Sequence, residues 1–133
     1  GSLHRRMLSD DALTASSGSE WVPQYSRIDM DGAWCPDKTD VRQWLQWSFK
    51  EPMLIRRIHT RGYDVDDAPH FVTAFMLSFS VDGEVWHRHP MIFGGNSSAD
   101  EVKENLLEPP ITAQSLRLHP AECFGGIAVR AEL

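Results

Sequence analysis

Three aspartates lie close together in the segment from Gly62 to His70, namely Asp64, Asp66 and Asp67. Carboxylates at this spacing repel one another unless a cation lies between them. A solvated acidic loop is the simplest interpretation, and contact with a cationic partner is the second. A calcium site is the third, because the spacing matches no known calcium loop. Whether it contacts a cationic partner or holds calcium, the segment disfavours an anionic lipid surface.

Two histidines, His87 and His89, stand two positions apart on either side of Arg88. On a strand they would point the same way and could bind a metal ion, but no third ligand follows at a fixed spacing. An exposed, polar strand end is therefore the simpler interpretation. If these three residues have a function, we expect them to contact a ligand as part of the loop that ends with Pro90 and Met91.

The sequence Trp21-Val22-Pro23 lies between two polar stretches, where an apolar side chain has no periodic place in a core. An exposed tryptophan there would be a binding anchor. A tryptophan folded back over the mouth of the domain is the alternative, and the sequence does not choose between the two.

Catalytic and nucleic-acid chemistry find no support in the sequence. The chain has no H-E-x-x-H, G-x-S-x-G, G-x-x-x-x-G-K or C-x-x-C motif, so we expect no enzyme and no bound cofactor beyond the calcium alternative. Thirteen Lys and Arg stand against 19 Asp and Glu, a net charge of −6. Without a basic field to attract phosphates, nucleic acid is excluded as a partner.

Short β-rich segments separated by Gly, Pro and Asp must position these residues. Strands are predicted at Gln43–Phe49, Leu54–Thr60, Phe71–Ser80, Ser115–Leu118 and Ile127–Leu133. All but Leu54–Thr60 show alternating apolar side chains, and that segment is expected to be a strand because Ile55 and Ile58 can anchor it. Pro52 predicts a turn between the first two strands, and Asp82-Gly83 predicts a hairpin whose second strand begins at residue 84 or 85. We expect the last strand to have one apolar face. The absence of crossover helices favours an antiparallel sandwich or barrel.

The chain has 133 residues, enough for one domain with a single core. Its longest nearly apolar run, Phe71 to Val81, is too short to span a membrane. Gly1-Ser2 is expected to be a cloning remnant, with residues 1–7 as a lead-in and residues 8–133 as one domain excised from a larger protein.

The four other tryptophans lie on or beside the predicted strands and are expected to be mostly core, at positions 34, 44, 47 and 86.

Nine segments, in order, resemble the discoidin family, the C-type domains of coagulation factors V and VIII. They are LSDDALTASS (8–17), YSRID (25–29), DGAWCP (31–36), QWLQWSF (43–49), IHTRG (58–62), FVTAFMLSFSVDGEVW (71–86), FGGN (93–96), LLEPPITAQSLRLHP (106–120) and GGIAVRAEL (125–133). The resemblance implies an all-β, eight-stranded antiparallel jelly-roll with ligand-binding loops at one end. DGAWCP also resembles the collagen-binding discoidin-domain receptors and carboxypeptidase-like relatives. In those receptors a Trp and an Asp of the binding loops match Trp21 and Asp31, whereas other contact positions hold Tyr63 and residue 69 or 70.

Cys35 and Cys123 are 88 positions apart, which is no zinc-ligand spacing but is compatible with a disulfide bridge. The resemblance to the receptors supports a shifted version of their bridge, because the last strand here has Ala128 where they have a cysteine. Asn96-Ser97-Ser98 is an N-glycosylation sequon. Both features predict an extracellular domain.

Together these features predict a non-catalytic extracellular recognition module for adhesion to a protein or matrix ligand, collagen among the candidates. The expected contacts are Trp21, Val22, Pro23, Asp31, Arg61, Tyr63, Asp64, Asp66, Asp67, His70, His87, Arg88 and His89. Sugar-binding relatives offer one alternative, in which Trp21 or Tyr63 stacks on a sugar while Arg61 and the aspartates bind its hydroxyls. A phospholipid membrane is the other.

Overall fold

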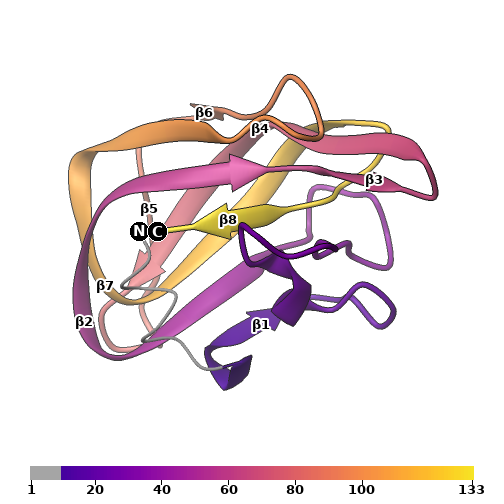
Figure 1. Cartoon of the computed structure of the whole chain (residues 1–133). Helices are drawn as coiled ribbons and strands as arrows, with labels where there is room; N and C mark the ends of the chain where they lie inside the picture. Colours follow the sequence, from indigo (N-terminus) through magenta and orange to yellow (C-terminus); the bar gives the residue numbers. More distant parts are fainter. Residues whose placement is uncertain (1–9) are drawn as a thin grey trace.

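Two long strands carry the fold of the computed structural model, which describes residues 10–133. Strand β2 runs over Leu45–Arg61 and β7 over Lys103–Phe124, and the two pair antiparallel along most of their length. Their pairing shifts register between Ser48 and Met53 and again between Ile55 and Arg57. The two strands curve together, as Figure 1 shows, so that their two halves contribute to different layers of the molecule.

The remaining strands extend these two layers. The first half of β2 and the second half of β7 join β1, β4, β5 and β6, whereas the second half of β2 pairs with β8 (Figure 1). The hairpin of β3 and β4 closes one end. The remaining elements are η1 (Asp10–Ala12), β1 (Leu13–Ala15), η2 (Pro23–Ser26), β3 (Tyr63–Val65), β4 (Ala68–Ser80), β5 (His87–Arg88), β6 (Phe93–Gly94) and β8 (Arg130–Glu132). The predicted eight-stranded, antiparallel all-β fold is confirmed.

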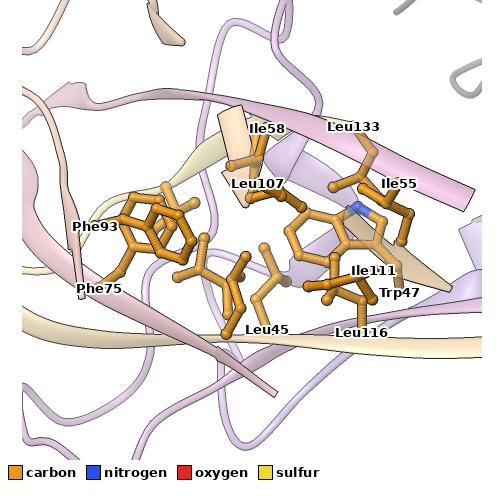
Figure 2. Packing of buried hydrophobic residues seen from close by; sticks show 14 of the residues in the cluster. Leu45, Trp47, Ile55, Ile58, Phe75, Phe93, Leu107, Ile111, Leu116 and Leu133 are labelled. Atoms are coloured by element: carbon orange, nitrogen blue, oxygen red, sulfur yellow. The ribbon is translucent and has the colours of Figure 1, made fainter. Parts of the chain in front are cut away.

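The core lies between the layers and is built by the alternating side chains that the sequence predicts. Leu45 and Trp47 of β2, Phe75 of β4, Leu116 of β7 and Phe93 of β6 belong to one buried cluster (Figure 2). Within it the rings of Phe75 and Phe93 stack with their centroids 5.2 Å apart. Each such buried side chain contributes about 1.5–3 kcal/mol to stability. The remaining tryptophans differ in burial. Trp34 is fully buried as predicted, but Trp44 and Trp86 are only half-buried and lie outside the core cluster.

Three strand predictions need correction. Pro52 does not end a strand, because β2 bends at this register shift and continues. Beyond the Asp82-Gly83 turn the next strand begins at His87, since the carboxylate of Asp82 accepts the backbone N–H groups of residues 84 and 85 and so extends the turn. The segment from Ile127 to Ala131 is buried on both faces, because it lies beneath the 25–35 loops as well as against the core.

The predicted cloning remnant and lead-in, and the first residues of the LSDDALTASS segment, lie outside the described residues. Within residues 10–133, no helix has the length and apolar character needed to cross a membrane.

Candidate functional site

Trp21, Tyr63 and Asp31 come together at the end of the molecule that holds the β3–β4 hairpin. The Trp21 and Tyr63 rings lie 5.8 Å apart at an interplanar angle of 54°. The Tyr63 hydroxyl donates a hydrogen bond of 2.8 Å to Asp31 Oδ1. These contacts join three segments that are distant in the sequence, so the end of the domain forms one continuous surface.

The Trp21 loop is fixed by its backbone. The Trp21 carbonyl accepts a hydrogen bond of 3.0 Å from the Cys35 N–H, and Pro23 begins the short helix η2. Trp21, Val22 and Pro23 are all half-buried. Trp21 is therefore neither fully exposed nor fully covered: its ring lies against Tyr63 and part of it stays accessible, and its role as a binding anchor stays a prediction.

Two arginines, Arg130 and Arg61, stabilise this end of the domain by donating hydrogen bonds to backbone carbonyls. Arg130 is buried; its Nε donates to the Gly62 carbonyl and its Nη1 to the Met30 carbonyl, both at 2.8 Å. Its guanidinium lies 5.2 Å from the centre of the Tyr63 ring, and burial lowers its pKa. Arg61 donates to the carbonyls of Ile28 and Asp100. Arg61 is therefore a positioning residue rather than the free ligand contact that the sequence suggested.

Arg130 is not among the residues that the sequence predicts for the site, because strand alternation places it on the polar side of the last strand. A signal was nevertheless present, since Arg130 is the one charged residue between Gly125 and Ala131. An arginine inside such a run usually satisfies buried carbonyls.

The hydrogen bond from Tyr63 also perturbs its own acidity. The bond to the carboxylate of Asp31 raises the pKa of Tyr63 above the ordinary value of 10.0, and desolvation adds to this effect. The phenol is therefore fully protonated near neutral pH and keeps donating to Asp31.

The acidic segment forms the tip of the β3–β4 hairpin. Val65 pairs with Ala68, which leaves Asp66 and Asp67 as a two-residue turn with φ of 52° and 65°. A short polar side chain tolerates this left-handed conformation better than most residues. Asp64, Asp66 and Asp67 are exposed, as expected for a solvated acidic loop.

The calcium alternative gains no support from this hairpin. Across residues 10–133, no three His, Cys, Asp or Glu side chains are grouped so that they could hold a metal ion.

Next to the hairpin lies an open cleft that the sequence did not predict. Asp64 and Asp100 line it together with Ser97, Phe71 and Phe124. The two phenylalanine rings stack at 5.1 Å, and Phe124 is 56% exposed at the edge of the cleft. A large exposed ring beside carboxylates and a hydroxyl is an arrangement that offers both stacking and hydrogen bonding to a ligand.

His70 is at the base of the same hairpin. Its Nδ1 lies 2.9 Å from the Ala68 carbonyl, and its ring packs so closely on Gly126 that a side chain at residue 126 would collide with it. His70 is half-buried, and its hydrogen-bond contact is with the backbone of the same hairpin.

The predicted contact at residues 87–89 is wrong for His89. This side chain is 2% exposed; its Nε2 lies 2.9 Å from the Pro109 carbonyl and its Nδ1 accepts the Met91 N–H. Strand β5 ends at Arg88, so the alternation that would have aligned the two histidines does not continue. His87 and Arg88 are exposed, but they pair with residues 78 and 79 of β4, far along that strand from the hairpin.

The predicted disulfide is also wrong, because Cys35 and Cys123 are both free thiols. Cys35 is fixed opposite Trp21 in the loop region, whereas the β4–β7 register places Cys123 opposite Val72. Burial raises the pKa of Cys35 to about 12 and also raises the pKa of Cys123. Both thiols are consequently poor nucleophiles.

Asn96 does not have the surface position that glycosylation requires. It is 4% exposed, and its Nδ2 donates to the carbonyls of Thr60 and Glu101 at 2.9 and 2.8 Å. Both amide hydrogens are therefore engaged inside the protein. The structure contradicts the glycosylation prediction, since an attached sugar needs this nitrogen at the surface.

A β jelly-roll with an aromatic and acidic loop end defines a class of ligand-recognition domains. The family model for the F5/8 type C domain matches residues 12–133, so the chain belongs to that family. Members of this family bind ligands that include proteins, glycans and phospholipids, and they are typically non-catalytic.

Similar proteins agree with this assignment. The chain is 30% identical to coagulation factor V of Bos taurus in an alignment that is 146 positions long. This alignment covers 98% of the chain but only 7% of that protein. Discoidin II from Dictyostelium discoideum has a TM-score of 0.85 at 21% identity, over 98% of this chain and 55% of that one. A Clostridium perfringens CBM32 domain in complex with GalNAc-β-1,3-galactose has a TM-score of 0.72 at 15% identity, over 93% of each chain. These two structures share the fold.

Proposed function

We propose that the chain is a non-catalytic, extracellular recognition domain of a larger protein, and that it binds a protein or matrix ligand through its loop end. The observation that carries this proposal is the hydrogen bond between Tyr63 and Asp31, which joins the Trp21 loop to the acidic hairpin. The binding surface comprises Trp21, Asp31, Tyr63, Asp64, Asp66 and Asp67. Its partly exposed aromatic rings supply contact area, and its carboxylates select the partner.

The charge of this surface favours a cationic partner. Asp31, Asp64, Asp66 and Asp67 are all exposed within the surface, and the whole chain has a net charge of −6. A basic protein segment gains favourable electrostatics on approach, whereas the headgroups of an anionic bilayer are repelled. Phospholipid binding, the property of one alternative branch of the family, is therefore the weaker candidate for this chain.

Carbohydrate binding is the second candidate, and the cleft beside the hairpin favours it. The exposed face of Phe124 provides a platform for a sugar ring, while Asp64, Ser97 and Asp100 provide hydrogen-bonding groups for hydroxyls. A ligand in this cleft would depend on Phe124, whereas a protein ligand on the binding surface would depend on Trp21.

Binding assays with two variants separate these candidates. The purified domain is tested against immobilised fibrillar and triple-helical collagens, against phosphatidylserine vesicles and on a glycan array, each with and without calcium. We expect saturable binding to a protein probe that Trp21→Ala reduces and Phe124→Ala does not. Binding to glycans alone, with the opposite dependence on the two variants, would move the assignment to carbohydrate recognition.

A further inference from the structure

The sheet formed by β5, β4, β7 and the first half of β2 carries an unusual row of polar residues on its outer face. The register of four neighbouring strands aligns Arg88 of β5, Ser78 of β4, Arg117 of β7 and Gln46 of β2. Directly paired residues in a sheet point to the same face. The residues next to them in sequence, such as Leu77 and Leu118, point into the core. The row therefore lies on the outer side of the sheet.

Arg117 is held at the centre of this row by two tryptophans. Its guanidinium carbon lies 4.1 Å from the ring centre of Trp44 and 4.2 Å from that of Trp86. Its Nε donates a hydrogen bond of 2.7 Å to Gln46 Oε1. These contacts fix the plane of the guanidinium, and its terminal nitrogens have no hydrogen-bond partner among residues 10–133. Arg117 thus presents a preorganised fork of N–H donors.

The positive charge of this face comes from Arg117 and from Arg88, which belongs to the same row. His119, two residues further along β7, lies with its Nε2 2.6 Å from Ser78 Oγ. Burial lowers the pKa of His119, and the positive charges of Arg117 and Arg88 lower it further. Neither arginine forms an ion pair with any described residue. In a chain with a net charge of −6, Arg88 and Arg117 therefore place two positive charges on this face with no ion-pair partner among residues 10–133, whereas the lowered pKa keeps His119 neutral near pH 7.

We propose that this Trp–Arg face is a second docking surface, which binds an acidic segment of a protein partner. Its residues are Trp44, Ser78, Trp86, Arg88, Arg117 and His119. Carboxylates match a guanidinium fork in geometry and charge, and Trp and Arg are the residue types that dominate protein–protein hot spots. The face is separate from the loop end, because Ser78 lies ten residues, or about 33 Å, along β4 from Ala68.

The contacts of Arg117 favour an acidic protein segment over a neutral sugar. Each of the two tryptophans already has the Arg117 guanidinium over one face of its ring. The terminal nitrogens of Arg117 have no hydrogen-bond partner among residues 10–133, so a carboxylate can accept their N–H groups without displacing either indole.

The test follows the indole N–H signals of Trp44 and Trp86 by NMR while poly-L-glutamate is added, with heparin as a separate titration. Trp44→Phe and Trp86→Phe variants assign the two signals. We expect saturable shifts of both signals with poly-L-glutamate, and these shifts should weaken as salt is raised.

Three variants decide whether the shifts arise from the Trp–Arg face. Arg88→Gln removes an exposed charge and Arg117→Lys keeps the charge but loses the fork, so each should weaken the affinity about tenfold. Arg56→Gln removes an exposed charge of β2 outside the face and should leave the affinity unchanged. No saturable shifts, an equal loss in Arg56→Gln, or undiminished binding in Arg88→Gln would overturn the proposal. Shifts with heparin but not with poly-L-glutamate would overturn it as well, and would assign the face to a sulfated glycan.

Discussion

The Tyr63 hydroxyl donates a hydrogen bond to the carboxylate of Asp31, and this contact ties the β3–β4 hairpin to the DGAWCP segment across 32 positions of the sequence. The same tyrosine ring contacts Trp21 on one side and lies near the guanidinium of Arg130 on another. Tyr63 is thus the residue through which the Trp21 loop, the acidic hairpin and the buried scaffold meet.

The first prediction concerns the titration of Tyr63. Because Asp31 raises its pKa above 10.0, the folded protein favours the protonated phenol. The stability that this bond contributes is present below pH 10 and is lost as the pH rises through the folded pKa. We expect Asp31→Asn to shift the corresponding phenolate step in the ultraviolet absorbance to lower pH. Tyr63→Phe identifies that step, and an unchanged titration in Asp31→Asn would argue against the hydrogen bond.

The joint between β2 and β3 supplies a second prediction. A side chain at Gly62 would collide with the His70 carbonyl and would meet the Phe71 Cβ at 2.6 Å, both of which belong to the paired strand β4. We expect Gly62→Ala to destabilise the fold by about 1–3 kcal/mol in a denaturant titration, because backbone would have to move. Gly94→Ala is the matched control, since a methyl group at that position would meet no other atom within 4 Å. Equal stability of both variants would show that the hairpin is not held this tightly.

A third prediction follows from the two free thiols. With a pKa of about 12, Cys35 is almost entirely protonated at pH 8, so its alkylation in the native protein should be about a thousandfold slower than that of free cysteine. In denaturant both cysteines should react fully. Mass spectrometry of the intact protein measures this, with Cys123→Ser used to isolate Cys35. A native mass two hydrogens lower, with no label after unfolding, would instead establish the bridge.

The buried Asn96 leads to a fourth prediction. Asn96→Ala leaves the carbonyls of Thr60 and Glu101 without their donor, so we expect a loss of about 2–4 kcal/mol in unfolding free energy. Ser98→Ala destroys the same sequon at an exposed position and should cost about 0.5 kcal/mol. When the domain is secreted from a glycosylating cell, its mass should show no sugar on Asn96. A folded product that carries a glycan there would refute this placement.

The strands were largely predictable from the sequence because burial imposes a period of two. The predicted stripe of Phe71, Phe75, Leu77 and Phe79 is buried at its first three positions, whereas Phe79 is only half-buried against the core. Strand ends were less predictable. β2 continues through Pro52 at a register shift, and β5 begins later than expected because the Asp82 carboxylate accepts backbone N–H groups that extend the preceding turn. These outcomes depend on side-chain hydrogen bonds and register, which alternation alone does not encode.

The site was predictable only in part. Trp21, Asp31 and Tyr63 lie together, because each occupies a loop or strand end at the same end of the fold. Phe124 and Asp100 were missed, since they approach the hairpin only through the pairing of β4 with β7 and the path of the loop after β6.

His89, Asn96 and the two cysteines were misassigned for a related reason. Histidine, asparagine and cysteine have functional roles at surfaces and structural roles in interiors, and only the packing of distant segments decides between the two.

Binding at the loop end is tested most directly by the ratio of affinities of wild type and Trp21→Ala, measured by surface plasmon resonance on immobilised matrix proteins, collagens among them. Unfolding curves of the two proteins are compared alongside. We predict that Trp21→Ala weakens binding to the protein probe at least tenfold, about 1.4 kcal/mol, with the melting temperature nearly unchanged. Equal affinity of the two proteins for a probe that binds saturably would contradict the assignment of this surface.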